Sequence, residues 1–119
     1  MRISVLVTGA TGFLGRHLIP ELGFCESIHC LVRKTSNVSS IQNKNVEFFY
    51  GDITDKATLQ KAMQGVDTVI HMAAECNSKK TDLMYSANVE GTKRIVEVCK
   101  SLSINKLIYI KHAKATNYT

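Results

Sequence analysis

Short apolar runs alternate along the chain with longer segments in which apolar residues recur at helical spacing. The apolar runs predict five strands, at 3–7, 27–32, 46–50, 68–72 and 107–110, and the helical patterns predict helices at 13–22, 55–64 and 82–102. The stretch 35–45, rich in serine and asparagine, predicts a loop with room for one helical turn. Strands that alternate with helices favour right-handed βαβ units, so the pattern predicts an α/β fold with a parallel sheet.

Four residues predict where the helices begin, bend, weaken or end. Thr54 is a residue type that caps helix N-termini, and Gly65 is the type that ends them, so the two bound the helix at 55–64. Pro20 falls past the first turn of its helix, where it removes a backbone hydrogen bond, and we expect a bend there. Gly91 is the weak point of the long helix, because glycine is a poor helix former.

The composition suits one compact domain without a nucleic-acid partner. The 119 residues are 45% hydrophobic and 21% charged, which is ordinary for a globular protein. The formal charge of +5 is spread over single and paired basic residues, and no basic run of the kind that follows a phosphate backbone occurs. Neither a signal peptide nor an apolar run long enough to span a bilayer is found, so we expect a cytoplasmic protein with no membrane partner.

The four cysteines, Cys25, Cys30, Cys76 and Cys99, do not predict a metal site. Their spacings are irregular, and the sequence holds neither a CxxC pair nor a cluster of histidine and cysteine. Three of them lie in or beside apolar segments, which predicts reduced cysteines in the core.

The segment VLVTGATGFLGRHL places three glycines at intervals of three directly between a predicted strand and a predicted helix. In such a turn Gly9 permits the tight bend, Gly12 lets a pyrophosphate approach the backbone, and Gly15 lets the helix pack closely on the strand. The helix N-terminus then presents amides and the positive end of its dipole to phosphates. The segment therefore predicts a dinucleotide site, with a purely structural glycine turn as the alternative.

The segment TGATGFLG resembles the TGxxGxxG signature of the extended short-chain dehydrogenases/reductases, the NAD(P)-dependent epimerase/dehydratase family. Four further segments resemble landmarks of that family in the same order: GDITD at 51–55, VIHMAAE at 69–75, ANVEGT at 87–92 and KLIYI at 106–110. The resemblance implies a Rossmann-like doubly wound parallel sheet of about five strands. It covers only the cofactor-binding half of a typical member, so we expect a truncated fold with an NAD(P)-binding domain at 1–110.

The resemblance also implies which residues contact the cofactor. Asp52 would bind the adenine amino group with Ile53 beside the ring, and small alanine side chains would line the cofactor. A carboxylate at the carboxyl end of a parallel strand agrees with that role, although an aspartate there also often makes only a turn. His71 is expected to be a buried strand residue rather than a base. The full implied set is Gly9, Thr11, Gly12, Phe13, Leu14, Gly15, Arg33, Lys34, Asp52, Ile53, Ala73, Ala74 and Asn88.

The residues after the second strand indicate which cofactor is preferred. In this fold an acidic residue there binds the ribose of NAD, whereas an arginine accommodates the extra phosphate of NADP. The sequence reads CLVRK, with Arg33 and Lys34 and no acidic residue nearby, and Arg16 follows the last glycine. We therefore expect NADP in preference to NAD.

The catalytic elements of the family are not found in this sequence. Members use a serine or threonine after the fifth strand and a Tyr-x-x-x-Lys pair on the next helix. Here Lys111 and His112 follow the strand, and Tyr118 has one residue after it. We assign no catalytic residue, and we expect the chain to stop before its chemistry, in a polar tail at 111–119 that is a candidate for disorder.

Two functions are consistent with these features. The first is the NAD(P)-binding domain of an epimerase, dehydratase or reductase without its catalytic residues, whose substrate class would be a sugar nucleotide or a carbonyl compound. The alternative is a stand-alone sensor or interaction module that binds NADP(H) without catalysis, and a relic without a ligand is a third reading. The long helix at 82–102 resembles one through which family members pair, so a homodimer is plausible.

Overall fold

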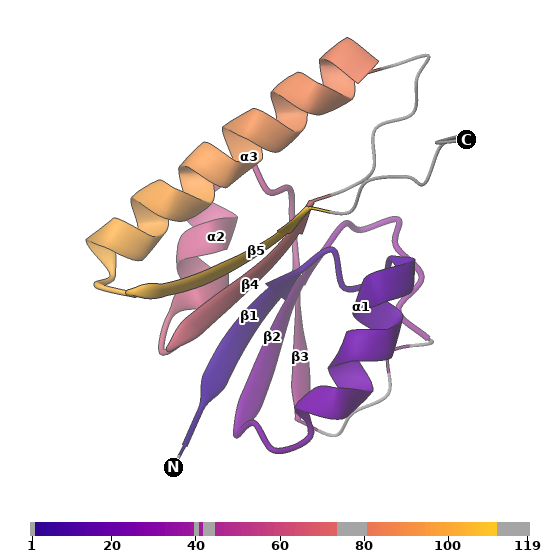
Figure 1. Ribbon diagram of the computed structural model, residues 1–119, viewed down its shortest axis with the longest axis vertical. Coiled ribbons are helices and arrows are strands. Elements are labelled where there is room, and N and C mark those ends of the chain that lie inside the picture. The colour runs from indigo at the N-terminus through magenta and orange to yellow at the C-terminus, as the bar shows by residue number, and fades with distance from the viewer. Residues whose placement is uncertain (1, 40, 42–44, 74–80, 112–119) are drawn as a thin grey trace, which may run out of the picture.

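The computed structural model describes residues 2–39, 41, 45–73 and 81–111, with backbone alone for residues 73, 81–88 and 111. Its five strands form a single parallel sheet in the order β3-β2-β1-β4-β5. Figure 1 shows this sheet with the first strand at its centre. The strands are β1 (Ser4–Thr8), β2 (Ser27–Val32), β3 (Val46–Tyr50), β4 (Thr68–Ala73) and β5 (Lys106–Lys111).

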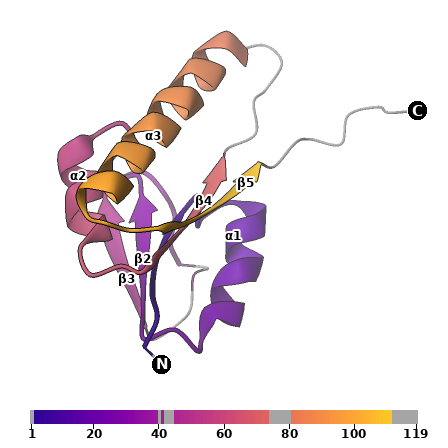
Figure 2. The same ribbon diagram turned by 60° about the vertical axis from the view of Figure 1, so that its left-hand side comes forward.

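Helices cover both faces of the sheet, as the turned view in Figure 2 shows. Helix α1 (Phe13–Leu18) and the 3-10 helix η1 (Ile19–Leu22) lie on one face. Helices α2 (Lys56–Met63) and α3 (Thr81–Ser101) lie on the other. The predicted fold class, an α/β protein with a doubly wound, Rossmann-like parallel sheet, is confirmed.

Two apolar cores hold these layers together, and the central strand contributes to both. Val5 and Val7 point into the core beneath α1 and η1, whereas Leu6 between them points into the core beneath α2 and α3. Successive side chains of a strand point to opposite faces, so a strand covered on both sides must be apolar throughout. This explains why Val5, Leu6 and Val7 in the middle of β1 are all apolar.

The first helical segment differs from the single helix expected at 13–22. The α-helix ends at Leu18, and the chain continues as a 3-10 helix in which Pro20 is the second residue. Proline has no amide hydrogen and its ring crowds the preceding turn, so the α-helical hydrogen bonds end before it. The expected disturbance at Pro20 is therefore a change of helix type.

The predicted loop at 35–45 contains no helix among the residues that the structure describes there. In place of a helical turn, the amide of Ser36 donates to the carbonyl of Arg33, and the amide of Ile41 donates to the carbonyl of Val38. Ile41 is buried and joins the core beneath α1. The described residues of this segment thus form single turns, and Val38 also packs against the same core.

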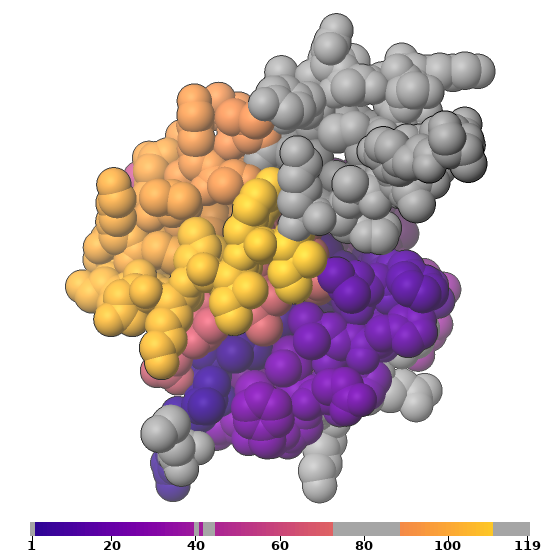
Figure 3. Space-filling view, viewed as in Figure 1, coloured from indigo at the N-terminus to yellow at the C-terminus, as the bar shows by residue number. Residues whose placement is uncertain are grey.

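Strand β5 forms one side of the sheet, and both of its faces are only partly covered. Leu107, Ile108 and Tyr109 are 37%, 50% and 48% exposed. Figure 3 shows atoms of β5 in yellow at the surface, between those of α3 and those of the α1 layer. Among the described strands, β5 pairs with β4 alone.

Candidate functional site

The sequence-predicted residues gather at the carboxyl edge of the sheet, where the strands end and the connections to helices begin. Gly9 follows β1, Arg33 follows β2, Asp52 lies two residues after the end of β3, and Ala73 ends β4. The strand order reverses at β1, because the chain first adds β2 and β3 on one side and then β4 on the other. Ligands of open α/β sheets bind at such a reversal point.

The glycine turn has no space for side chains at its first and third glycines. Gly9 has φ +73°, and a Cβ atom there would lie 2.8 Å from the carbonyl oxygen of Met72 on the neighbouring strand. A Cβ atom on Gly15 would collide with the backbone of Ala10. These are the tight bend and the close helix packing expected from the sequence.

Gly12 occupies the N-cap position of α1. It has extended backbone angles, no side chain caps the helix, and the first turn of α1 holds no acidic residue. The amide of Gly12 donates to the carbonyl of Gly9 at 3.2 Å, which closes the turn. Phe13 is exposed and its ring lies 4.4 Å from that of His17, while Leu14 packs into the core.

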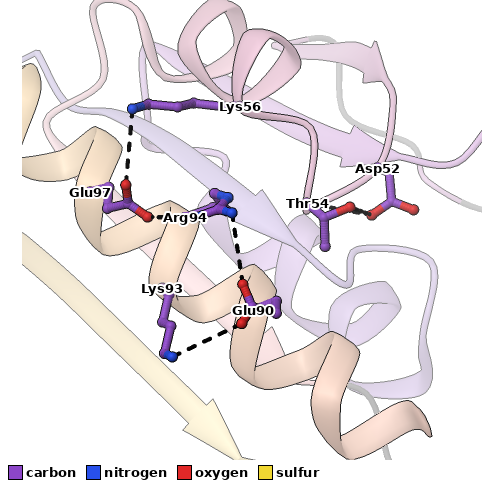
Figure 4. Close-up of polar contacts among 7 residues, drawn as sticks. All are labelled: Asp52, Thr54, Lys56, Glu90, Lys93, Arg94 and Glu97. Atoms are coloured by element: carbon purple, nitrogen blue, oxygen red, sulfur yellow. Dashed lines mark hydrogen bonds and ion pairs between the residues drawn. The ribbon is translucent and has the colours of Figure 1, made fainter.

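Arg33 and Asp52 come together where β2 and β3 end. The amide of Gly51 donates to the carbonyl of Val32 at 2.9 Å and holds the two strand ends side by side. The amide and hydroxyl of Thr54 both donate to Oδ1 of Asp52, at 2.9 Å each, as Figure 4 shows for the side chains. These hydrogen bonds, and then the nearby charge of Arg33, hold the pKa of Asp52 below its usual range.

Asp52 therefore forms a turn through one of its carboxylate oxygens, and its contact with adenine stays a prediction. The turn uses Oδ1, and in the part of the chain that the structure describes we find no hydrogen bond to Oδ2. A carboxylate has two oxygens with separate lone pairs, so Oδ2 keeps the capacity to accept from a ligand.

Ile53 packs against helix α3 at a glycine. A Cβ atom on Gly91 would lie 2.7 Å from Cγ2 of Ile53 and 3.0 Å from its Cδ1. Gly91 is buried, and Ile53 is half-buried at the border of the core beneath α2 and α3. The glycine that looked like a weak point of the helix is thus where α3 makes its closest approach to the segment after β3.

His71 is a buried strand residue, as predicted, with both ring nitrogens engaged. Nδ1 lies 2.6 Å from Oγ1 of Thr8, and Nε2 lies 2.9 Å from Oγ1 of Thr92 on α3. The side chain is 2% exposed, and burial lowers its pKa to about 4, so the imidazole is neutral near pH 7. The Thr8 oxygen also accepts from the amide of Met72 at 3.2 Å.

Three predicted site residues have no described side-chain geometry. Ala73 and Asn88 lie in β4 and α3, where the backbone alone is described. Ala74 lies outside the described residues, as do Cys76 and the tail from His112.

Sequence reasoning missed Thr8, Thr54 and Thr92. Each acts through a hydroxyl whose partner is another residue of the edge: Asp52 for Thr54, and His71 for the other two. A threonine at the end of an otherwise apolar strand was the available signal for Thr8. Thr92 lies within the ANVEGT segment, but nothing local to that segment indicates a partner 21 residues away.

The described cysteines belong to the core. Cys25, Cys30 and Cys99 are buried and carry free thiols, and burial raises the pKa of Cys30 to about 12. Across the described ranges, no three histidine, cysteine or acidic side chains are grouped as metal ligands would be. No helix in the same part of the chain has both the length and the apolar character needed to cross a membrane.

A parallel sheet in the order 3-2-1-4-5, with a glycine turn after its central strand, defines a Rossmann-like dinucleotide-binding fold. The profile of the 3-beta hydroxysteroid dehydrogenase/isomerase family matches residues 6–117. The chain belongs to this family of extended short-chain dehydrogenases/reductases and corresponds to the NAD(P)-binding part of its members. The family resemblance inferred from the motifs is thereby confirmed.

Relatives of known description support this assignment. The chain is 37% identical over 113 residues to the human sterol-4-alpha-carboxylate 3-dehydrogenase, decarboxylating, a match that covers 90% of this chain and 28% of the relative. It is 32% identical over 114 residues to a putative dihydroflavonol 4-reductase from Synechocystis, covering 92% and 32%. The chain thus spans about a third or less of the length of these relatives.

Solved structures share the fold. A UDP-glucose 4-epimerase from Thermus thermophilus, in complex with NAD, superposes with a TM-score of 0.72 at 28% identity, over 88% of this chain and 36% of that one. The protein gox2253 superposes with a TM-score of 0.75 at 37% identity, over 89% and 33%.

Proposed function

We propose that this chain binds NADP(H) at the carboxyl edge of its sheet, as the cofactor-binding part of an oxidoreductase. The observation that carries the proposal is that one edge of the sheet holds a glycine turn with no room for side chains at Gly9 and Gly15, an arginine, and a turn aspartate with one unused oxygen. The names of the human, bovine and mouse relatives indicate a sterol with a 3-hydroxyl group as the substrate class of the whole enzyme.

The pyrophosphate would lie against the glycine turn. Gly12 is exposed, and a Cβ atom there would meet only the carbonyl oxygen of Gly9 at 3.4 Å, so a phosphate oxygen can approach the backbone at this position. Thr11, Phe13 and Leu14 would complete this part of the site. The lack of an acidic side chain in the first turn of α1 removes a source of repulsion.

The adenine would lie over the segment that follows β3. Oδ2 of Asp52 would accept from the adenine amino group while Oδ1 holds the turn with Thr54. The half-buried side chain of Ile53 would contact the ring. Ala73, Ala74 and Asn88 complete the proposed set, toward the nicotinamide end.

The preference for NADP rests on Arg33 and Lys34. Both are exposed directly after β2, and none of the residues 33–39 is acidic. An arginine in this place can pair with the 2′-phosphate of NADP through two hydrogen bonds, whereas the acidic residue that would bind the ribose of NAD is missing.

We further propose that the 119-residue chain binds the cofactor without turnover. Lys111 ends β5 and His112 follows it, where the family has a serine or threonine, and none of the four tyrosines is followed by lysine four positions later. Reduction of a carbonyl substrate by the purified chain would contradict this part of the proposal.

The cofactor preference is tested by Arg33→Gln with Arg2→Gln as the matched control. Arg2 precedes β1 at the opposite edge of the sheet and pairs with Glu26 at 3.7 Å. Loss of a charged hydrogen bond predicts that Arg33→Gln weakens NADPH binding about tenfold and leaves NADH binding nearly unchanged. Calorimetric titration gives both affinities, and an equal loss for the two cofactors, or no loss, would contradict the role of Arg33.

A further inference from the structure

Helix α3 contacts the proposed site through two consecutive residues that meet different segments. Gly91 lies against Ile53, with space for a hydrogen but not for a methyl group. Thr92 lies 2.9 Å from Nε2 of His71, on the strand next to the central one. One turn of the helix therefore touches the segment proposed for the adenine and the strand beside the glycine turn.

The histidine that bonds to Thr92 also bonds to the residue immediately before the glycine turn. His71 Nδ1 lies 2.6 Å from the hydroxyl oxygen of Thr8, which immediately precedes Gly9. The amide of Met72 donates to the same oxygen, and the carbonyl of Met72 is the group that leaves Gly9 no room for a side chain. Contacts thus run without interruption from α3 through β4 to the start of the turn.

These hydrogen bonds are mutually consistent. Because the Thr8 oxygen accepts from the Met72 amide, its own hydrogen can be donated to Nδ1 of His71. A neutral imidazole with an acceptor at Nδ1 carries its hydrogen at Nε2, which then donates to Thr92. Thr8 and His71 are 3% and 2% exposed, so losing the hydrogen bond between them would leave a buried polar group unsatisfied. The hydrogen bond between His71 and Thr92 is partly buried, because Thr92 itself is half-buried.

We propose that α3 positions the two halves of the dinucleotide site relative to each other. The hydrogen bonds of Thr8, His71 and Thr92 fix where the helix sits on the sheet, and Gly91 then fixes where Ile53 lies. The inference rests on the proposed function, and it adds Thr8, His71, Gly91 and Thr92 as positioning residues that act without touching the cofactor.

The strongest test is Gly91→Ala, with Lys93→Ala on the exposed face of the same helix as its control. A methyl group at position 91 must displace Ile53, so NADPH binding should weaken about fivefold or more. Alanine is a better helix former than glycine, and this gain offsets part of the free-energy cost of moving Ile53. The variant should therefore lose more of its NADPH affinity than of its free energy of unfolding. Lys93→Ala should keep the wild-type affinity, since Lys93 pairs only with Glu90 at 3.9 Å among the described contacts.

A second pair of variants keeps the test independent of how Gly91→Ala folds. Thr92→Val preserves the shape of the side chain but removes the hydroxyl, whereas Thr92→Ser preserves the hydroxyl. Thr92→Val should weaken NADPH binding at a temperature where it is fully folded, and Thr92→Ser should restore the wild-type value.

The outcomes separate this inference from the function on which it rests. If the folded wild-type chain binds NADPH and either Gly91→Ala or Thr92→Val, once folded, binds it equally well, the positioning role is overturned while the proposed function stands. If the folded wild-type chain binds neither NADPH nor NADH, the proposed function fails and the inference fails with it.

Discussion

Gly9 and Gly65 have nearly the same backbone conformation, with φ +73° and φ +75°, but different surroundings. A Cβ atom on Gly9 would lie 2.8 Å from the Met72 carbonyl oxygen, whereas one on Gly65 would meet nothing within 4 Å. Alanine at either position adopts an unfavourable φ at a cost of about 1 to 2 kcal/mol. Only at Gly9 does a steric conflict add to that cost.

We therefore predict that Gly9→Ala lowers the free energy of unfolding by clearly more than Gly65→Ala does. Denaturant unfolding of the two variants and the wild type measures the difference, which isolates the contact with Met72. Equal losses would show that the turn has enough freedom to move away from β4.

His71 makes the stability of the fold depend on pH. Burial lowers its pKa from 6.5 to about 4 in the folded chain. Between these values the unfolded chain binds a proton that the folded chain does not, so the free energy of unfolding rises with pH across this window and is constant above it for this group. The contribution that is lost on acidification is up to about 3 kcal/mol.

The measurement is urea unfolding between about pH 4.5 and 7.5 for the wild type and His71→Gln. His71→Gln should be less stable at neutral pH and should show a smaller slope. An unchanged slope in His71→Gln would contradict the account of the buried imidazole.

At the residue scale, the sequence predicted a residue's role where the local backbone or the local burial permits few residue types. Gly9 and Gly15 were identified because a turn between strand and helix requires them, and His71 because its strand is apolar on both sides. The partners of His71 were not identified, since Thr8 lies 63 residues away and Thr92 lies 21 residues away. Such pairs depend on strand order and helix placement, which no local pattern contains.

At the scale of elements, the start of α2 corrects the sequence interpretation. Asp55, not Thr54, is the N-cap: its Oδ1 accepts from the amide of Ala57 at 3.1 Å, and its Oδ2 accepts from the hydroxyl of Thr58 at 2.7 Å. Thr54 instead donates to Asp52. Both residue types are good caps, and the choice between them follows from where β3 ends and the chain turns.

We predict that Asp55→Ala lowers the thermal midpoint of unfolding by a few degrees, because the first turn of α2 loses its cap. Thr54→Ala should leave α2 intact but loosen the turn of Asp52, so its main effect should be on NADPH affinity. Thermal unfolding and calorimetric titration of both variants separate the two roles. A larger stability loss for Thr54→Ala than for Asp55→Ala would contradict this assignment.

Every described helix and strand was predicted from the apolar pattern, apart from the 3-10 form of η1, and β2 and β3 have the predicted bounds, whereas several other ends differ by one residue. Strand β1 runs from Ser4 to Thr8, one residue later than expected, and β4 and β5 extend beyond the apolar runs that predicted them. The ends of a strand depend on pairing with its neighbours, and polar residues such as Lys106 and Lys111 pair as well as apolar ones. Pro20 indicated that the first helix is disturbed there, but nothing in the local sequence indicated that the chain continues as a 3-10 helix.

Charged side chains on the outside of α2 and α3 add little to the fold. Lys56 lies 3.9 Å from Glu97 and links the two helices, and Arg94 lies 2.8 Å from Glu97 within α3, as Figure 4 shows. Exposed ion pairs of this kind contribute little in water. The helices are instead held to the sheet by the apolar core that contains Leu59, Ile95 and Val98.

At the scale of the molecule, the glycine turn follows the central strand of the sheet, and β3 and β5 are the two edge strands among the described residues. In the order β3-β2-β1-β4-β5 the glycine turn lies next to the point where the strand order reverses, and helices cover both faces of the sheet. On β5, three consecutive apolar or aromatic residues are partly exposed, with Ile108 the most exposed of them at 50%. The chain covers about 28% of the human relative, so the rest of such an enzyme has no counterpart in these residues.

The measurement that tests the account most directly is a calorimetric titration of the 119-residue chain with NADPH and, separately, with NADH. Circular dichroism first establishes that the protein is folded at the temperature used. The account predicts saturable binding of one dinucleotide per chain, with NADPH bound more tightly than NADH. A folded chain that binds neither NADPH nor NADH would show that the glycine turn and its neighbours have only a structural role. That result would contradict the proposed function.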